Sequence, residues 1–358
     1  MVFYNKDRDV SALVHGDDFV FVGDDEDLSW IQELVKSWFE VKVRGRLSGE
    51  KGDVREMVIL GREMRWTEEG LEYEADRKHR GKVLEHFGLG DKSAGCVSNG
   101  GKLTKAEEEE DEEEGEELSR EETKTFRGMA ALLNFYSQDC PDIQFPAKEI
   151  SRDMAKPRLK SWVKVKRTAR YLVGRDSVVW KFRWQEEEQR MIVFTDSDWG
   201  GSREERKSTS GGVIMWGSHC WKTWSSTQGA VALSSAEAEF YAMIDGTQRG
   251  KWAKTVAREI GVEVGDQEMI LGTDPSAAKS FVARRGLGKM RHIEVRDLWL
   301  QEEVRKGGVK VVKVDGEENP ADLMTKYLHE KEIKSRLEGM GMVWIGRRNG
   351  GSGGERGE

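Results

Sequence analysis

The stretch MIVFTDSDWGG, residues 191–201, is an apolar run that ends in two aspartates, the pattern of a buried strand that leads into a polar turn. Two further strand-like runs, 212–216 and 220–225, follow after short turns and predict an antiparallel meander. A helix is predicted from Ser234 to about Glu259, with a glycine interruption. Alternating strands and helices come after it. We therefore expect an α/β fold whose C-terminal part is a mixed sheet covered by helices.

Four acidic residues fall near the ends of these separate predicted elements. Two end strands, one lies about a turn and a half into the long helix, and one opens the last helix. They are Asp196 in TDSDWGG, Asp274 in LGTDPSA, Glu239 in SSAEAEFYA and Asp322 in ENPADLMTK. Functional groups of open α/β sheets gather at the carboxyl ends of strands, so we expect these carboxylates to converge on one site.

Converging carboxylates repel one another unless cations neutralise them. Magnesium prefers oxygen ligands and is usually held by a few carboxylates together with substrate phosphate oxygens. Two such ions about 4 Å apart activate a water and stabilise the leaving oxygen of a phosphodiester. The acids therefore predict a site for two Mg²⁺ ions, or Mn²⁺ in their place, with all four residues as catalytic metal ligands.

Each acid also has a local alternative. Asp196 could be a turn residue, and Asp322 a first-turn acid favoured by the helix dipole. Glu237 has the spacing of a capping box with Ser234, whereas Glu239 has no such local role. His292 in RHIEV is a candidate auxiliary residue for phosphate orientation or proton transfer, with a structural histidine as the alternative.

The first ninety residues show alternating strand and helix patterns. Residues 10–22 predict a β-hairpin with a tight turn at Gly16, Asp17 and Asp18. A helix is predicted at 28–39, a strand around 58–64 and a helix at 79–87, in a βαβ-like alternation. The early onset of the strand pattern suggests that the chain begins inside a domain.

Charge is unevenly distributed. The chain has 58 basic and 66 acidic residues, a net charge of -8, but ten of the acids lie in EEEEDEEEGEE at 107–117. Residues 148–183 hold twelve Lys or Arg and three acids, which suits an anionic partner. On the helix predicted at 162–172, a basic face is a candidate nucleic-acid-binding surface, with a merely solvated face as the alternative. Its residues are Lys160, Lys164, Lys166, Arg167 and Arg170.

Cysteine spacing and hydropathy bound the cellular context. The three cysteines have no paired spacing, so neither a zinc knuckle nor a disulfide framework is indicated. No apolar run approaches the roughly 20 residues that span a bilayer. We expect an intracellular protein, cytoplasmic or nuclear, with no membrane partner.

Six ordered motifs resemble a known family. TDSDWGG, STSGGVIMWG, WSSTQGAVALSSAEAEFYA, LGTDPSAAK, RHIEV and ENPADLMTK are similar to the ribonuclease H domain of copia-type retrotransposon polyproteins. Upstream, HGDDFVFVG, LGREMRW, RGMAALLNFYSQDCPDI, SRDMAKP and KRTARYLVG resemble the end of the reverse transcriptase and its connecting segment. The resemblance covers nearly the whole chain, apart from the acidic insertion and the glycine-rich tail.

The resemblance implies a domain plan. Five segments are expected, in chain order: 1–94, a truncated reverse transcriptase palm and thumb remnant; 95–124, a disordered acidic insertion; 125–187, a helical basic connection; 188–340, a ribonuclease H-like domain; and 341–358, a disordered glycine-rich tail.

The resemblance also implies metal-dependent hydrolysis of the RNA strand of RNA–DNA hybrids, with the family's metal-binding acids at Asp196, Glu239, Asp274 and Asp322. Asp17 and Asp18 match the paired aspartates of the polymerase palm, but His15 and Gly16 precede them where the family has a tyrosine and one more residue. A palm also needs an upstream aspartate. We therefore expect no polymerisation by this chain alone. A missing polymerase portion or a separate subunit would have to supply the rest of the palm.

Two alternatives to a ribonuclease stay open. One is a catalytically dead retrotransposon relic that at most binds nucleic acid. The other is a transposase or integrase on a similar sheet, which needs only three acids and which the NPAD motif disfavours. The enzymatic hypothesis depends on geometry, because Asp196, Glu239 and Asp274 must lie within reach of shared metal ions.

Overall fold

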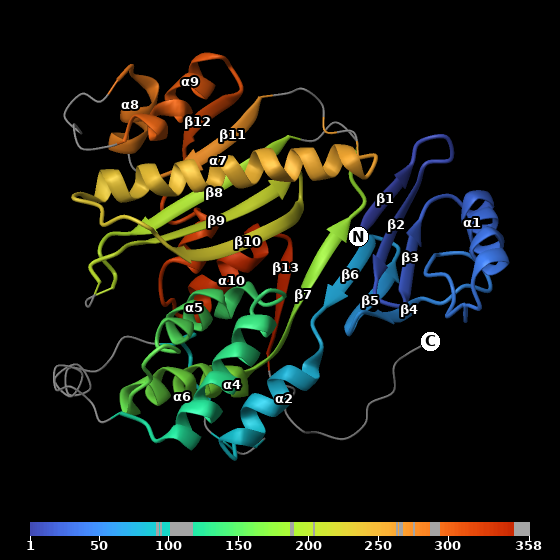
Figure 1. The fold of residues 1–358 in the computed structure, drawn as a ribbon, viewed down its shortest axis with the longest axis horizontal. Helices are drawn as coiled ribbons and strands as arrows, with labels where there is room; N and C mark the ends of the chain where they lie inside the picture. Colours follow the sequence, from blue (N-terminus) through green and yellow to red (C-terminus); the bar gives the residue numbers. More distant parts are fainter. Residues whose placement is uncertain are drawn as a thin grey trace.

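The chain folds into three β-sheets and a set of covering helices, as expected for an α/β protein (Figure 1). The computed structural model describes residues 1–90, 93, 95–100, 117–186, 190–202, 205–262, 264, 268–274, 276–286 and 294–346. No helix among these residues is long and apolar enough to cross a membrane.

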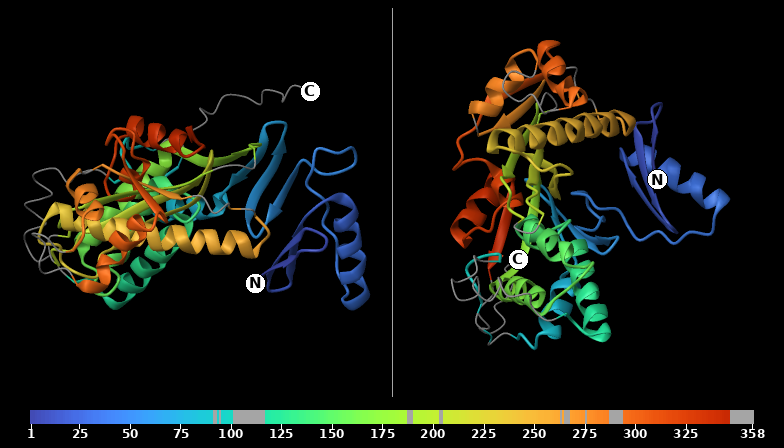
Figure 2. Two further views of the ribbon diagram at one scale, coloured as in Figure 1. Left: turned by 90° about the horizontal axis from the view of Figure 1, so that it is seen from above. Right: turned by 60° about the vertical axis from the view of Figure 1, so that its left-hand side comes forward.

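The first sheet is a small antiparallel one at the N-terminus. It contains β1 (Val2–Asn5), β2 (Val10–His15) and β3 (Asp18–Val22), and α1 (Asp25–Trp38) follows it. His15 pairs with Asp18 across a turn in which Gly16 has a φ of 60°, which confirms the predicted hairpin. This sheet adjoins the C-terminal end of the long helix α7 (Ser235–Glu259), where the Ser11 hydroxyl donates a 2.8 Å hydrogen bond to the Ile260 carbonyl (Figure 2).

The second sheet joins three distant segments of the chain. Its strand order is β13-β7-β6-β5-β4, and every neighbouring pair is antiparallel. The strands are β4 (Glu56–Ile59), β5 (Arg62–Thr67), β6 (Gly70–Glu74), β7 (Arg175–Arg183) and β13 (Met342–Gly346).

This second sheet corrects two predictions. The single strand expected around 58–64 is divided between β4 and β5 by a turn at Leu60 and Gly61, so the βαβ-like alternation is a meander instead. The tail expected to be disordered from 341 begins with a strand, β13, whose Met342 is buried against Trp180 of β7. The expected boundaries near residues 94, 188 and 341 therefore fall between segments that share one sheet.

A helical layer lies below the sheets in Figure 1. It contains α2 (Arg77–His86), α4 (Arg120–Tyr136), η1 (Pro141–Ile143), α5 (Gln144–Arg152) and α6 (Leu159–Gly174). A capping box of Ser119 and Glu122 begins α4, so the expected disordered insertion 95–124 ends earlier than predicted. At its other end, Asn99 is buried and donates to the Asp142 carbonyl over 2.8 Å. Most of the acidic run itself, residues 107–116, lies outside the described residues.

The third sheet carries the predicted acids. Its order is β10-β9-β8-β11-β12, antiparallel from β10 to β8 and parallel from β8 to β12, which confirms the meander and the mixed sheet. The strands are β8 (Met191–Asp198), β9 (Thr209–Trp216), β10 (His219–Thr227), β11 (Met269–Thr273) and β12 (Val309–Lys313). The elements that follow β11 and β12 are α8 (Ser276–Ala283), η2 (Val295–Leu298), α9 (Trp299–Arg305), η3 (Pro320–Met324) and α10 (Glu330–Gly339).

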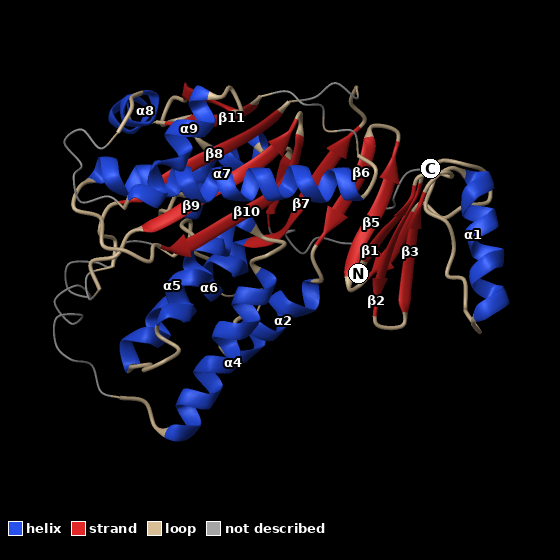
Figure 3. Cartoon of the chain, turned by 45° about the horizontal axis from the view of Figure 1, so that its top comes forward, coloured by secondary structure: helices blue, strands red, loops and turns tan. Residues whose placement is uncertain are grey.

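Helix α7 lies across one face of this sheet, as Figure 3 shows. Its glycines allow the close approach, because a Cβ on Gly246 would lie 2.4 Å from Thr195 Cγ2, and one on Gly250 2.4 Å from Met269 Sδ. The glycine interruption in the predicted helix is therefore a packing requirement. The buried side chains of α7 include Phe240 and Met243, which share one apolar cluster with β8, β9 and β11.

Candidate active site

Asp196 lies near the carboxyl end of β8, where the sheet is covered by other elements. Its side chain is buried, with the residue 5% exposed. The Thr325 hydroxyl donates to Asp196 Oδ2, and the Lys326 ammonium lies 3.3 Å from the same oxygen. Asp196 is therefore a buried carboxylate that pairs with the Lys326 ammonium. It lies within β8 and is not a simple turn residue.

Glu239 reaches the same place from α7. The side chain of Ser234 caps the helix, and Glu237 accepts a hydrogen bond from the Leu233 amide over 2.8 Å, which confirms a local structural role for Glu237. Glu239 points to the sheet instead, where its Oε1 accepts from the Ser197 amide over 3.3 Å. Its Oε2 is buried and has no hydrogen-bond partner among the described residues.

Asp322 approaches from the other side, in the short helix η3. Asn319 anchors this segment by donating to the Thr195 carbonyl of β8 over 3.0 Å and by capping η3 through the Ala321 amide. Gly211 of β9 leaves room for it, because a Cβ there would lie 2.6 Å from both Met324 and Thr325 side-chain atoms. The NPAD motif thus holds Asp322 beside the end of β8.

Two cations hold the carboxylate of Asp322. Lys326 contacts Asp322 Oδ1 over 2.7 Å, and Arg336 of α10 contacts Oδ2 over 3.2 Å. Lys326 therefore bridges Asp196 and Asp322. We did not predict Lys326, Thr325 or Arg336 from the sequence. The spacing of Asp322 and Lys326, four residues apart, was the available signal for the lysine.

Asp274 follows β11, the parallel neighbour of β8. The register pairs Gly272 with Phe194, and its continuation by two residues places Asp274 level with Asp196. The carboxylate of Asp274 lies near the loop after β12, where a Cβ on Gly316 would be 2.8 Å from Asp274 Oδ2. No direct interaction between Asp274 and the other three acids is described.

The electrostatics of the site reflect burial and mutual repulsion. Burial raises the pKa of Asp196 above its ordinary value, and Lys326 acts in the opposite direction. Burial, followed by the Asp196 carboxylate, raises the pKa of Glu239. The same burial opposes the charge of Lys326, but Asp196 and Asp322 outweigh it and raise the pKa of that ammonium. The site therefore favours a bound cation.

The raised pKa of Glu239 predicts a pH-dependent gain of stability in Glu239→Gln. The folded protein binds more protons than the unfolded chain above the ordinary glutamate pKa of about 4.3, so wild-type stability falls as pH rises through the raised pKa. The variant avoids this loss. We expect urea unfolding to show a gain on the order of 1–3 kcal/mol at pH 8 and little gain near pH 4.

Glu338→Gln is the matched control, because Glu338 is an exposed glutamate on α10. It should unfold like the wild type at both pH values. Equal stability of Glu239→Gln and the wild type at pH 8 would contradict the electrostatic account of the site.

The structure brings Asp196 into electrostatic interaction with both Glu239 and Asp322, and places Asp274 just after the adjacent strand β11. Among the residues that the structure describes, no three acidic, histidine or cysteine side chains are gathered closely enough to hold a metal ion. Lys326 lies between Asp196 and Asp322, and Asp274 lies against the loop at Gly316. Carboxylate oxygens remain the donors that Mg²⁺ prefers, and the unpartnered Glu239 Oε2 is a free ligand atom.

The other predicted site residues lie elsewhere or outside the described residues. His292 belongs to the residues that the structure does not describe. Asp17 is exposed at the turn of the N-terminal hairpin, and Asp18 lies 3.4 Å from Arg44 in an exposed ion pair. The two aspartates thus form the tight acidic turn that the sequence predicted.

Intramolecular acids neutralise much of the basic segment 148–183. Arg175 is fully buried against Asp142, and Lys164 contacts Asp153 over 2.9 Å. Of the basic face predicted on α6, Lys166 and Arg170 are exposed, whereas Lys160, Lys164 and Arg167 are half-buried. The charge excess available to a partner is therefore smaller than the sequence count.

Comparison with known proteins shows that the chain is similar to part of several transposon polyproteins. It is 29% identical over 210 residues to the "Retrovirus-related Pol polyprotein from transposon TNT 1-94" of Nicotiana tabacum. This alignment covers 58% of this chain and 16% of the polyprotein. The chain is 24% identical over 221 residues to the corresponding polyprotein from transposon RE2 of Arabidopsis thaliana, covering 62% and 15%. The chain thus spans about a sixth of the length of these relatives.

A shorter relative is the "Secreted RxLR effector protein 161" of Plasmopara viticola, 31% identical over 112 residues, which covers 31% of this chain and 78% of that protein. No protein-family model matches the chain. The fold and the polyprotein matches define a retrotransposon-derived α/β protein. Its homologues include Pol polyproteins from copia-type retrotransposons, at 24–29% identity over about 60% of the chain.

Proposed function

We propose that this chain is a ribonuclease H that uses divalent metal ions to hydrolyse the RNA strand of RNA–DNA hybrids. The observation that carries the proposal is the convergence of Asp196, Glu239 and Asp322, from a strand, a helix and a short 3-10 helix, with a buried and unpartnered oxygen on Glu239. Two of these acids, Asp196 and Glu239, are buried and have raised pKa values, which is typical of functional sites.

The oxygen donors suit magnesium chemically, and Asp196, Glu239, Asp274 and Asp322 are the residues that would hold it. These side chains would have to draw together first, because no three of them are gathered closely enough in the described part of the chain. When bound, magnesium supplies Lewis acidity toward the phosphate and lowers the pKa of a water molecule. Binding requires the Lys326 ammonium to leave the space between Asp196 and Asp322, because both would neutralise the same oxygens.

The residues of the chain have distinct roles in the proposed hydrolysis. A water oxygen forms a bond to phosphorus while one ester bond to phosphorus breaks, and the departing oxygen takes up a proton. Asp196, which interacts with both Glu239 and Asp322, would be the central metal ligand. Asn319 and Arg336 are positioning residues, because they fix Asp322 without occupying the acidic site themselves. The 2′-hydroxyl distinguishes the RNA strand from the DNA strand.

The hybrid is the proposed partner, held by its phosphates. Lys166 and Arg170 of α6 are exposed and available for such contacts. Phosphate contacts fix a duplex without reading its bases and weaken steeply as salt rises.

Cleavage of a labelled hybrid by the full chain tests the proposal. We expect Mg²⁺-dependent cutting of the RNA strand in a hybrid labelled on both strands, and no cutting of either strand in EDTA. A DNA duplex of the same sequence should stay intact. Intact hybrid with a folded protein would overturn the proposal and favour the second candidate.

The second candidate is a catalytically dead relic that at most binds nucleic acid. The position of Lys326 favours it, because an internal ammonium already neutralises Asp196 and Asp322 without a metal. Calorimetric titration with Mg²⁺ separates the two candidates, since a relic whose lysine blocks the site would bind no Mg²⁺. For polymerisation, the exposed turn at Asp17 and Asp18 gives no support in this chain.

A further inference from the structure

A polar cavity of about 230 Å³ lies at the free edge of the third sheet, away from the acidic site. Its walls are β10, the helices α4 and α5, and the second half of α7, which Figure 1 shows close to β10. Arg249 lies ten residues along α7 from Glu239, or about 15 Å at the rise of an α-helix. The lining contains three cations, Lys148, Lys222 and Arg249, and no acidic residue.

Several hydrogen-bonding groups of this cavity have no partner. They are Gln144 Oε1, Thr223 Oγ1, Trp224 Nε1 and Ser225 Oγ, all buried, and they make up four of the twelve unpartnered buried side-chain atoms among the described residues. Buried polar groups are almost always paired with protein, water or a ligand, so these atoms can offer hydrogen bonds to water or to a bound molecule in the cavity. Three of the four atoms can donate, two from hydroxyls and one from an indole.

The cations of the cavity lack sufficient counter-charge. Arg249 pairs with Asp245 over 2.9 Å and lies over the Trp224 ring at 5.0 Å. Lys222 forms no ion pair within the described part of the chain, and its pKa is lowered by burial and by the neighbouring Arg249. An anion between Lys222 and Arg249 would relieve both effects.

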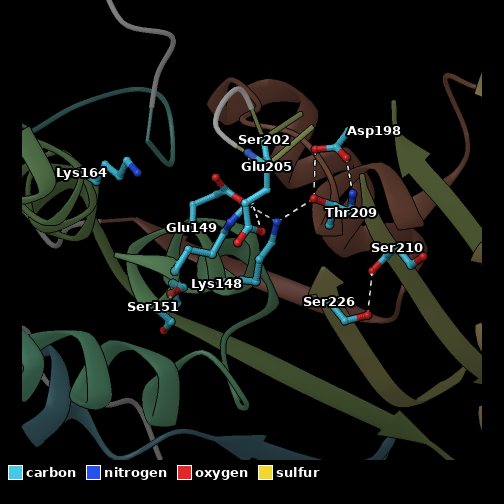
Figure 4. A network of polar contacts seen from close by, with 12 residues as sticks. Lys148, Glu149, Ser151, Lys164, Asp198, Ser202, Glu205, Thr209, Ser210 and Ser226 are labelled. Atoms are coloured by element: carbon cyan, nitrogen blue, oxygen red, sulfur yellow. Dashed lines mark hydrogen bonds and ion pairs between the residues drawn. The ribbon is translucent and has the colours of Figure 1, made fainter. Parts of the chain in front are cut away.

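Lys148 differs from these two cations because it already has partners within the protein. Its side chain is 11% exposed and contacts Glu149 and the Thr209 hydroxyl, which also donates to Asp198 (Figure 4). Lys148 therefore ties α5 to β9 and forms a fixed wall of the cavity. The ligand-binding charge falls to Lys222 and Arg249.

We propose that this cavity binds a phosphate group, carried either by a nucleic-acid backbone or by a free phosphate compound. Two cations and three neutral donors match a group with several acceptor oxygens. The volume exceeds the roughly 30 Å³ of a water molecule and is below that of drug-sized pockets. The inference does not rest on the proposed catalysis, because none of these residues belongs to the acidic site.

Binding measurements on Lys222→Met test the proposal. Inorganic phosphate is titrated calorimetrically, and a labelled single-stranded DNA of twelve nucleotides is followed by fluorescence anisotropy. We expect Lys222→Met to weaken phosphate binding about tenfold or more, the usual effect of a lost charge-assisted hydrogen bond. A second variant, Thr223→Val with Ser225→Ala, keeps both charges and should also weaken it.

Lys310→Met is the matched control, because Lys310 is an exposed lysine on β12, the opposite edge strand of the same sheet. It should leave phosphate binding unchanged. Weaker binding of both phosphate and DNA in Lys222→Met identifies a backbone site, and weaker binding of phosphate alone identifies a site for a free phosphate compound. Absence of phosphate binding to the wild type, or equal weakening in Lys310→Met, overturns the proposal.

The unfolding temperature shows whether the Lys222→Met variant is folded. Without ligand, Lys222→Met should unfold at or above the wild-type temperature, because the repulsion with Arg249 is removed. Phosphate should raise the unfolding temperature of the wild type and of Lys310→Met, but not that of Lys222→Met. An equal rise in all three proteins counts against a built site.

Discussion

Asp196→Asn is expected to lower the rate of hybrid cleavage about a thousandfold or more. The carboxylate of Asp196 is the central one, because it interacts with Glu239 and Asp322 and accepts from Thr325 and Lys326. Under the proposed mechanism, loss of its charge removes one of the metal ligands, worth several kcal/mol of transition-state stabilisation. Single-turnover cleavage of a labelled hybrid at saturating Mg²⁺ measures the effect.

Asp17→Asn is the control for this prediction. It makes the same chemical change at an exposed turn outside the acidic site, and the cleavage rate should stay within about twofold of the wild type. Circular dichroism and urea unfolding verify that Asp196→Asn is folded. Undiminished cleavage by a folded Asp196→Asn would remove the acidic site from the mechanism and leave the activity without a source.

The acids of the site were predictable because their position follows from local rules. An apolar run that ends in TDSD predicts an acid at the end of a strand, and the parallel register of β8 and β11 then brings Asp274 level with Asp196. Glu239 was distinguished from Glu237 because only Glu237 has the spacing of a capping partner. The structure shows Glu237 in that local role.

The cations of the site were not predictable in the same way. Lys326 follows Asp322 by one helical turn, so a local ion pair is the simplest expectation, but its second contact with Asp196 crosses 130 residues of sequence. Arg336 reaches Asp322 only because α10 packs beside η3. Such contacts depend on tertiary packing, which composition and periodicity do not encode.

The same reason explains the errors in organisation. Strand β13 pairs with β7, more than 150 residues earlier, and a short apolar run before a glycine-rich tail carries no signal of that partner. The count of basic residues in 148–183 was correct, but it ignored acids outside the segment, such as Asp142, Glu72 and Glu205. Net charge over a window therefore overstates the charge available to a ligand.

The second large effect is expected at the buried ion pair of Asp142 and Arg175, which joins η1 to the start of β7. Both side chains are 0% exposed, and the guanidinium contacts the carboxylate through two hydrogen bonds of 2.7 and 2.9 Å. The Tyr171 hydroxyl donates to the same carboxylate over 2.8 Å, and Arg175 donates to the Tyr136 hydroxyl over 2.8 Å. Four elements, α4, η1, α6 and β7, thus meet at one polar core.

Arg175→Met is expected to lower the free energy of unfolding by about 3–5 kcal/mol, because it leaves the Asp142 charge buried without a partner. Urea unfolding measures the loss. The double variant Arg175→Met with Asp142→Leu should be less destabilised than Arg175→Met alone, since replacement of both partners leaves no unpaired charge.

Arg305→Met is the matched control, because Arg305 and Glu302 form an exposed pair on α9, with side chains 58% and 42% exposed. It should not measurably change stability, since exposed pairs are solvated in the unfolded and folded states alike. A loss in Arg175→Met no larger than in this control would show that the core tolerates an unpaired Asp142, contrary to the role of the pair in joining the four elements. A double variant as unstable as Arg175→Met would assign the loss to packing around the guanidinium instead of to charge.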